Sequence, residues 1–475
     1  MGKNKYNYLA KNTILFTISS FGSKILVFLL VPFYTSVLST SDYGIADLIN
    51  TTANLLIFVL TIDIADSVLR FAIETTENQE GILSYGLKIL SLGTLLLGFS
   101  LILISKLELL NWNLNYYLFL FLIFFVLALN QILTNYLRAI NKIEDVAIAG
   151  IIVTIITIVS NLFLLLYLNL GINGYLWSIV IGNSTSCLFC FWKIGLGFIG
   201  KKCKKEVKRV MRRYSIPLIF NGVAWWMNSS LDKYFVVLLV GSSANGILAV
   251  ANKIPTIFSV FQNIFAQAWN LSAIKDFDKN DSDCFFSKTY SVYNALLVLV
   301  CSILIFCNVP LAKILFSKDF FEAWKYSSIL LVSGLFSALS SFCGSIFTAV
   351  KDSKIFAIST ILSAIINIIL NSIMIRIWGI QGAVIATAVS FLCIWLMRLR
   401  CTFKYIKWKV NIKKDLFAYA LLILQIIFEH MNGHMYWGQF GIFIVLIILY
   451  RKWLFSIVSL MKSICNKKQF KAKRE

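Results

Sequence analysis

The chain has 475 residues, of which 59% are hydrophobic and 14% are charged, and its mean hydropathy is +0.80. Soluble domains carry roughly 45–50% apolar and about 25% charged residues, so this composition excludes a soluble protein. The net charge of +22 would suggest nucleic-acid binding in a soluble chain. The ten cysteines are spread through apolar stretches and do not have the spacing of a disulfide framework.

A membrane-spanning helix needs about 20 mostly apolar residues. This rule predicts an all-α polytopic membrane protein with about fourteen transmembrane helices. In chain order, the predicted spans are 12–37, 44–69, 84–104, 115–137, 147–168, 175–194, 214–240, 246–271, 289–310, 327–349, 355–377, 382–398, 415–431 and 437–455. The first apolar stretch is longer than the core of a signal peptide, so we expect an uncleaved helix.

Lys and Arg are unequally divided between the two sets of loops. If the N-terminus is cytoplasmic, the inner segments hold 35 of the 44 Lys and Arg and the outer segments hold 5. Because basic loops remain on the cytoplasmic side, both termini are predicted to be cytoplasmic. This distribution explains the net charge without nucleic acid.

Two halves of the chain repeat each other. Residues 41–45 (SDYGI) open the second span and residues 243–247 (SANGI) open the eighth, 202 positions later. Residues 171–174 (GING) likewise match 379–382 (GIQG). Because six spans separate equivalent positions, the halves have the same orientation, which is a common transporter architecture. The predicted organisation is an N-terminal six-helix bundle, a basic cytoplasmic linker, a second six-helix bundle, and a helix pair with a basic tail, over residues 1–200, 201–213, 214–400 and 401–475.

Three local motifs do not indicate enzymatic or metal chemistry. Residues 195–201 (GLGFIGK) match a phosphate-binding glycine pattern, but Lys202 stands where a P-loop needs a hydroxyl. No nucleotide is therefore expected. Cys187 and Cys190 lie inside an apolar helix, which disfavours thiolates and indicates packing. His430 and His434, beside Glu429, are expected in a solvated outer loop, and no metal site is predicted.

Ionisable residues inside the spans are the informative ones, because each costs about 2.5–3.5 kcal/mol at mid-depth unless it faces a cavity or a partner. These residues are Lys24 in the first span, Asp63, Asp66, Arg70 and Glu74 along one face of the second, Asp232 and Lys233 in the seventh, and Lys253 in the eighth.

Two interpretations of these charges remain open. One is a salt-bridged ladder of Asp66, Arg70 and Glu74 on a helix face. Lys24 and Lys253 have no acidic neighbour three or four residues away, so a ladder does not explain them. The other interpretation is a polar, partly cationic cavity lined by the first, second, seventh and eighth helices, which would suit an anionic cargo. Trp225 and Trp226 lie mid-span and either stack on the cargo or pack in the core.

Several segments resemble the signatures of the polysaccharide transporter family. In the first half they are residues 23–34 (SKILVFLLVPFY), 43–48 (YGIADL) and 69–71 (LRF), and in the second half 232–234 (DKY), 246–247 (GI), 251–255 (ANKIP) and 267–269 (QAW). This family comprises the Wzx-type bacterial flippases for lipid-linked oligosaccharides within the multidrug/oligosaccharidyl-lipid/polysaccharide exporter superfamily. The likeness covers essentially the whole chain.

The resemblance implies a flippase of the bacterial cytoplasmic membrane that works by alternating access. Its cargo would be an undecaprenyl-diphosphate-linked oligosaccharide, moved to the outer leaflet for capsule, exopolysaccharide or O-antigen assembly, beside membrane lipid and a polysaccharide polymerase machinery. No cofactor is implied, and H⁺ or Na⁺ is the coupling ion to be expected. The implied site comprises the substrate-binding residues Lys24, Arg70, Lys233, Lys253, Trp225 and Trp226, with Asp63, Asp66 and Asp232 as charge partners or ion-coupling residues.

Two rival functions remain. A cation-coupled multidrug antiporter of the same superfamily would favour an acidic cavity. The cavity predicted here has more basic than acidic residues. A polytopic polysaccharide polymerase or glycosyltransferase usually needs a sizeable outer loop for catalysis, whereas the longest outer segment is about residues 311–326. We therefore expect a transporter and not an enzyme.

Overall fold

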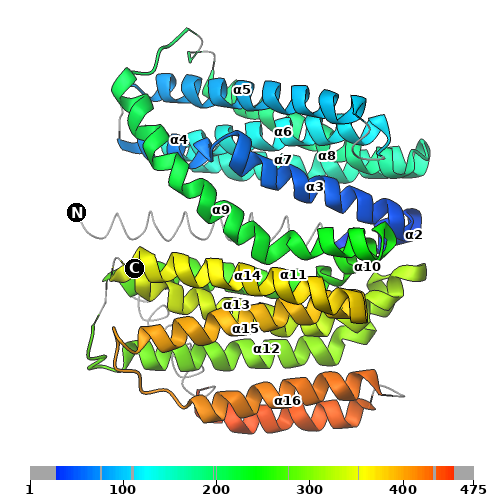
Figure 1. Ribbon diagram of the computed structural model, residues 1–475, viewed down its shortest axis with the longest axis vertical. Coiled ribbons are helices and arrows are strands. Elements are labelled where there is room, and N and C mark those ends of the chain that lie inside the picture. The colour runs from blue at the N-terminus through cyan, green and yellow to red at the C-terminus, as the bar shows by residue number, and fades with distance from the viewer. Residues whose placement is uncertain are drawn as a thin grey trace, which may run out of the picture. The chain divides into compact units, whose positions relative to one another are not determined.

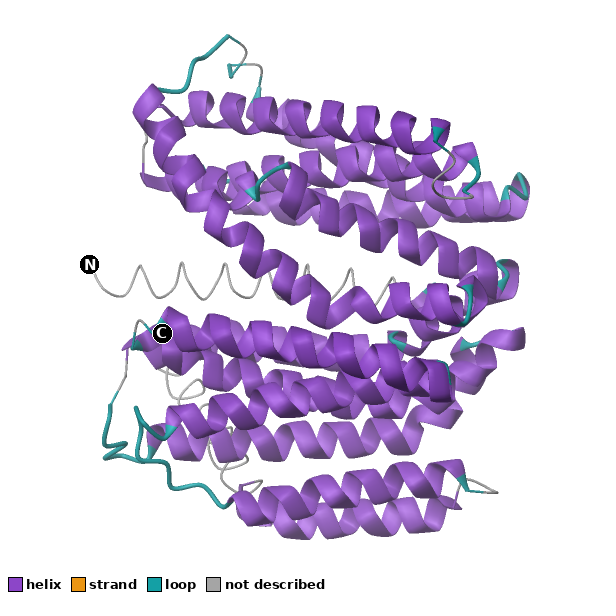
Figure 2. Ribbon diagram, viewed as in Figure 1, coloured by secondary structure: helices purple, strands orange, loops and turns teal. Residues whose placement is uncertain are grey.

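The computed structural model describes residues 28–74, 78–107, 112–195, 197–198, 200–275, 278–350, 352–431 and 435–453. These residues form helices joined by loops, without a strand (Figure 2), which confirms the all-α membrane fold. Among them, nine helices are long and apolar enough to cross a membrane, or ten if one bent pair counts as a single span. The number fourteen stays a prediction.

Packing divides the chain into two compact units. The first contains the described residues up to Val250 together with Leu315–Phe320, and the second contains the described residues of Ala251–Ile314 and from Phe321 onward. This division differs from the two predicted bundles, which were based on the sequence repeat and stay a prediction. Part of the predicted linker is helical, because a long helix begins at Lys205.

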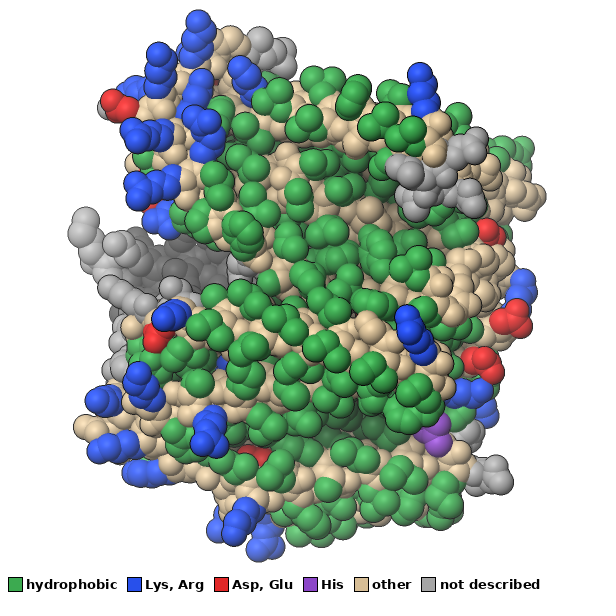
Figure 3. Space-filling model, viewed as in Figure 1, with side chains coloured by type: hydrophobic (Ala, Val, Ile, Leu, Met, Phe, Trp, Pro, Cys, Tyr) green, Lys and Arg blue, Asp and Glu red, His purple; other side chains and the backbone are tan. Residues whose placement is uncertain are grey.

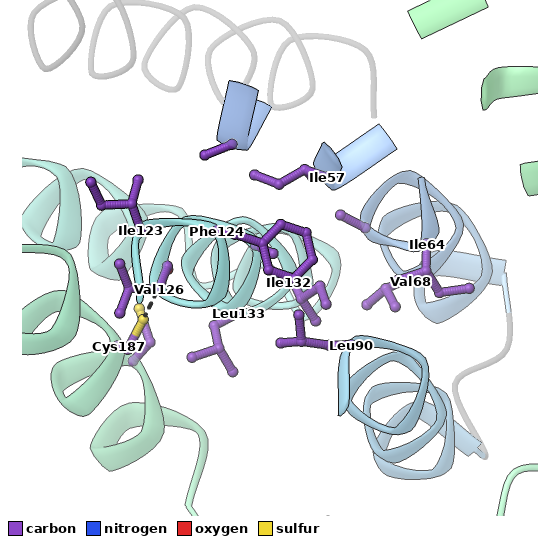
Figure 4. Packing of buried hydrophobic residues seen from close by; sticks show 14 of the residues in the cluster. Ile57, Ile64, Val68, Leu90, Ile123, Phe124, Val126, Ile132, Leu133 and Cys187 are labelled. Carbon is purple, nitrogen blue, oxygen red and sulfur yellow. Dashed lines mark hydrogen bonds between the residues drawn. The ribbon is translucent and has the colours of Figure 1, made fainter. Parts of the chain in front are cut away.

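The helices of the first unit are labelled in Figure 1. They are α2 (Val31–Val37), α3 (Thr40–Leu60), α4 (Ile64–Glu74), α5 (Gln79–Lys106), α6 (Leu114–Ala139), α7 (Ile143–Leu162) with the π-helical turn η2 (Phe163–Tyr167), α8 (Gly171–Ile194), α9 (Lys205–Leu239) and α10 (Ser242–Ala251). Helix α6 packs against α3, α4, α5 and α8. Its buried side chains, among them Phe124 and Leu133, meet Ile57, Ile64 and Leu90 in one apolar core (Figure 4).

The predicted second span, 44–69, is not one continuous helix. It is broken between α3 and α4, where Ile62 and Asp63 have φ values of 49° and 50°. This left-handed conformation is unfavourable for a β-branched residue and ends the helical ladder. Gly93 of α5 lies against the Leu60 carbonyl at this break. The predicted eighth span, 246–271, is likewise interrupted at Asn252, between α10 and α11 (Lys253–Lys275).

Helices α3 and α10 cross at two glycines of the repeated segments. A Cβ on Gly44 would overlap the Ser242 carbonyl oxygen, and a Cβ on Gly246 would overlap the Thr40 carbonyl oxygen. The hydroxyls pair in the same crossed way, Thr40 with Ser243 at 2.6 Å and Ser41 with Ser242 at 2.8 Å. In the sequence repeat, Thr40 corresponds to Ser242 and Ser41 to Ser243. Such reciprocal contacts are what a local two-fold axis through the crossing produces.

The helices of the second unit are α11, α12 (Phe285–Leu315), the 3₁₀ turn η3 (Lys318–Ala323), α13 (Trp324–Ala349), α14 (Ser353–Trp378), α15 (Ile380–Thr402), α16 (Ile412–His430) and a helix over residues 436–453. The segment Leu315–Phe320 belongs to the first unit. Helix α14 begins after Asp352, which caps it by accepting the Ile355 N–H at 3.2 Å. The Tyr405 hydroxyl also donates to this carboxylate and lowers the pKa of Asp352.

Buried polar contacts attach α16 to α12. The Tyr419 hydroxyl donates to Asn294 at 2.8 Å, Gln425 and Ser302 exchange two hydrogen bonds of 2.7 and 3.0 Å, and Asn308 donates to Glu429 at 2.6 Å. These contacts rise in the same order along both helices, which therefore run parallel, as the predicted topology requires. Polar contacts of this kind fix the register of helices in a membrane.

Replacing Gln425 by alanine is expected to lower the stability of the detergent-solubilised protein by about 1–2 kcal/mol. The change removes both bonds to Ser302 and leaves that buried hydroxyl without its acceptor. Thermal unfolding of Gln425→Ala, Ser302→Ala and the double variant measures the coupling, and the double variant should lose less than the sum. Leu424→Ala, on the exposed side of the same helix, is the control. Strict additivity would show that the two residues do not interact.

Candidate ion-pair site

An ion pair joins α3 to α9 in the first unit. The Lys233 ammonium lies 2.8 and 3.1 Å from the two carboxylate oxygens of Asp47 and 3.2 Å from the Thr51 hydroxyl. Asp47 and Thr51 are four residues apart, which places them on one face of α3. The side chains of Lys233 and Asp47 are 16% and 20% exposed. The pair is therefore partly shielded from water, where opposite charges attract more strongly than at an open surface.

Two tryptophans and a buried carboxylate lie near this pair on α9. Trp226 is buried, and its indole N–H donates to the Thr51 carbonyl at 3.1 Å, so the core-packing interpretation describes it. Trp225 is 65% exposed, and its contact with a ligand stays a prediction. Asp232 is buried and accepts the backbone N–H of Lys233 at 3.0 Å. Its charge also interacts with that of Asp47.

Helix α4 carries the other predicted charges. Arg70 pairs with Glu74 at 3.3 Å, and its guanidinium lies 4.7 Å from the ring centre of Tyr214 on α9. Asp66 does not extend this pair into a ladder, because its described partner is the amide of Asn135 on α6, at 3.4 Å. The ladder interpretation therefore holds only for Arg70 and Glu74.

Asp63 lies at the break between α3 and α4, and its carboxylate is buried. Its Oδ1 has no hydrogen-bond partner among the residues that the structure describes. Asp66 is near enough for the two charges to interact. Arg138 bonds Asn135 and adds a positive charge near Asp66. Arg138 lies just beyond the predicted span 115–137, and its position near Asp66 depends on α6 packing against α4.

The remaining predicted cations lie elsewhere. Lys24 falls outside the described residues. Lys253 is the first residue of α11, in the second unit. The cavity between the predicted bundles therefore stays a prediction.

The space-filling view shows where the surface charges of the first unit gather (Figure 3). Hydrophobic side chains cover the flanks of its helices, and Lys and Arg side chains cluster at the end where α9 begins. The exposed basic residues of this segment are Lys201, Lys202, Lys204, Lys205, Arg209, Arg212 and Arg213. An apolar band with a basic end is the pattern that the positive-inside rule predicts.

The second unit holds a buried cation that sequence analysis did not single out. Arg398 of α15 is 4% exposed and donates to Ser359 at 2.9 Å, to Ser340 at 3.1 and 3.2 Å, and to Thr360 at 2.8 Å. Among the described residues, no carboxylate forms an ion pair with it. The local sequence placed Arg398 at the end of a span, where basic residues are common, so no local signal marked it as buried.

The motifs at α8 and at the end of α16 are structural. Cys187 is buried, and its thiol faces the Val126 carbonyl at 3.8 Å (Figure 4). His430 does not lie in a loop as expected but is the exposed last residue of α16, and its neighbour Glu429 is buried against Asn308. The two ring nitrogens of His430 meet backbone carbonyls of Ile426 and Lys325. His434 lies outside the described residues.

The fold and these internal charges define a multi-pass membrane protein with ionisable groups held between its helices. Residues 9–270 match the family described as polysaccharide biosynthesis protein. This match covers more than half of the chain, so the chain belongs to that family.

Two curated relatives match about half of the chain. One is a probable low-salt glycan biosynthesis flippase of Haloferax volcanii, 26% identical over 243 residues, which are 50% of this chain and 50% of the relative. The other is an uncharacterised membrane protein of Methanocaldococcus jannaschii, 24% identical over 252 residues, which are 50% of this chain and 59% of the relative. The chain thus spans about half the length of the curated relatives it matches.

Solved structures show the same fold at low sequence identity. The lipid II flippase MurJ in an inward closed conformation has a TM-score of 0.68 and 16% identity, over 94% of this chain and 99% of that one. An inward-facing multidrug resistance transporter of the MATE family and MOP superfamily has a TM-score of 0.65 and 12% identity, over 80% and 94%. The fold is therefore shared by a lipid-linked substrate flippase and a drug transporter, and does not by itself choose between them.

Proposed function

We propose that this protein is a flippase that moves a polyprenyl-diphosphate-linked oligosaccharide across the membrane by alternating access. Membership of the polysaccharide biosynthesis family and the flippase among the relatives support this class of cargo. The observation that carries the proposal is Lys233, a partly exposed ammonium held inside the helical bundle by α3 and α9. An ammonium in such a position stabilises a phosphate by charge-assisted hydrogen bonds.

In the proposed cycle, the diphosphate and the sugars enter a cavity lined by Lys24, Arg70, Lys233 and Lys253, while the polyprenyl tail stays in lipid. The two predicted bundles then rock and expose the head group on the other side. Asp63, Asp66 and Asp232 are the proposed sites for a coupling H⁺ or Na⁺. The chain performs no covalent step in this scheme, and it acts as a transporter rather than an enzyme.

The proposed setting follows from the sequence resemblance. The membrane would be the bacterial cytoplasmic membrane with both termini inside, the carrier lipid undecaprenyl diphosphate, and the product a precursor of capsule, exopolysaccharide or O-antigen. A polysaccharide polymerase would use the exported units. Each of these details goes beyond the family membership and is part of the proposal.

Replacing Lys233 by alanine is expected to reduce flipping at least about tenfold, because a diphosphate loses a charge-assisted contact worth about 1.5–3 kcal/mol. The measurement uses purified protein in liposomes with a fluorescent polyprenyl-diphosphate oligosaccharide, whose appearance in the outer leaflet is followed by quenching. Lys88→Ala is the control, since Lys88 is an exposed lysine of α5. Transport of a cationic drug by wild-type protein, with no movement of the lipid, would instead establish the antiporter function.

A further inference from the structure

Lys233 and Arg70, the two described cations of the first unit that we propose for diphosphate binding, each form an ion pair with a carboxylate. Asp47 pairs with Lys233, and Glu74 pairs with Arg70. By contrast, the partners of the buried Arg398 of the second unit, among the residues that the structure describes, are hydroxyl and carbonyl oxygens. The carboxylate partner therefore distinguishes Lys233 and Arg70 from Arg398.

Asp47 and Thr51 surround the ammonium of Lys233 with oxygens. An ammonium has three N–H donors and no acceptor, and Nζ donates to Asp47 Oδ1 at 3.1 Å and to the Thr51 hydroxyl at 3.2 Å. The other carboxylate oxygen of Asp47 lies 2.8 Å from Nζ as an ion-pair contact and has no hydrogen-bond partner among the described residues. A diphosphate is also an anion, so it competes with the Asp47 carboxylate for the charge and the donors of Lys233.

The exposure of the pair allows such an exchange. The side chains of Lys233 and Asp47 are 16% and 20% exposed, so the pair is open in part to its surroundings, whereas Arg398 is 4% exposed. The exchange replaces one anion by another at the same cation. Lys233 therefore keeps a counter-charge throughout, which avoids the large cost of a shielded, unpaired ammonium.

We propose that Asp47 is an exchangeable counter-ion of Lys233: a diphosphate displaces the Asp47 carboxylate when the substrate binds, and Asp47 returns when the substrate leaves. This inference rests on the proposed function. It makes Asp47 a specificity-determining residue, because a neutral glycan or a free sugar cannot compete with a carboxylate for an ammonium. Competition from the Asp47–Lys233 ion pair also weakens diphosphate binding. Weaker binding favours release of the substrate after translocation.

The test measures binding of inorganic pyrophosphate and of farnesyl diphosphate to the full-length protein in detergent, by isothermal titration calorimetry. Asp47→Asn removes the competing charge, and we expect roughly five- to tenfold tighter binding of both probes. Asp47→Ser does the same with a smaller side chain and serves if the asparagine variant does not fold. Lys233→Ala should abolish the binding. Glu322→Gln, which removes a carboxylate from the surface pair with Lys325, should leave it unchanged.

The outcomes separate this inference from the proposed function. If Lys233→Ala weakens diphosphate binding but both Asp47 variants leave it unchanged or weaker, Asp47 only fastens α3 to α9, and the exchange is refuted while the function stands. If wild-type protein binds neither diphosphate, the proposed function fails. The double variant Asp47→Asn with Lys233→Ala is the last control. If Asp47→Asn tightens diphosphate binding even when Lys233 is absent, the exchange is likewise refuted.

Discussion

Alanine at Gly44 or at Gly246 is expected to reduce the flipping rate at least about tenfold. It should also lower the stability of the protein by about 1–3 kcal/mol. At each glycine the added Cβ would overlap a backbone carbonyl oxygen of the other helix, that of Ser242 or of Thr40. Backbone atoms cannot move aside as a flexible side chain can. Helices α3 and α10 must therefore separate at their predicted outer ends, which in the proposed cycle have to close before the cavity opens inward.

Flipping in liposomes and thermal unfolding in detergent measure this effect. Gly441→Ala is the matched control, because Gly441 is also helical and its Cβ would meet nothing within 4 Å. Wild-type rates in Gly44→Ala and Gly246→Ala would show that α3 and α10 do not cross closely.

Cysteine pairs test the crossing independently of the glycines. In a background without native cysteines, Ser41→Cys with Ser242→Cys should form a disulfide under mild oxidation, because these hydroxyls are 2.8 Å apart. Thr40→Cys with Ser243→Cys should do so as well. The uncrossed combination of Thr40→Cys with Ser242→Cys is the control and should link more slowly. Oxidation of the paired variants should stop flipping, and a reductant should restore it.

Replacing Arg398 by methionine or lysine is expected to lower the stability of the second unit by at least about 1–3 kcal/mol. The guanidinium joins three helices, since it extends from α15 to Ser340 on α13 and to Ser359 on α14. Methionine leaves these buried oxygens without donors. Lysine keeps the charge, but its single nitrogen cannot reach both helices with the forked geometry of a guanidinium.

Thermal unfolding and the yield of monodisperse protein report this loss. Arg400→Met is the control, because Arg400 lies two residues further along α15 and is exposed. If Arg398→Met unfolds at the wild-type temperature, the hydrogen bonds of Arg398 do not hold the three helices together.

Much of the fold follows from local features of the sequence. The length of each apolar run predicted helices such as α5, α6 and α12, because burial of an apolar stretch in lipid requires only that stretch and its own backbone hydrogen bonds. The breaks did not follow in the same way. The run 44–69 is apolar enough for one span, and only the packing against α5 shows that it ends at Leu60 and resumes at Ile64.

The candidate site was predictable in part. An ionisable residue inside an apolar run is visible in the sequence, which is why Lys233, Arg70 and Asp232 were expected to matter. Their partners were visible only where they lie three or four residues away on the same helix, as Glu74 does for Arg70. Asp47 lies 186 residues from Lys233, and nothing in the spacing connects them.

The sequence by itself determined that this is a helical membrane protein with ionisable residues inside its apolar runs, since hydropathy and residue types are properties of neighbouring positions. Only the tertiary structure showed that Gly44 and Gly246 lie at one helix crossing, that Asp47 forms an ion pair with Lys233, and that Arg398 is buried and donates to hydroxyl oxygens. Each of these contacts depends on which helix faces pack together. Its energy comes from residues that are far apart in the sequence, so neither segment alone reveals it.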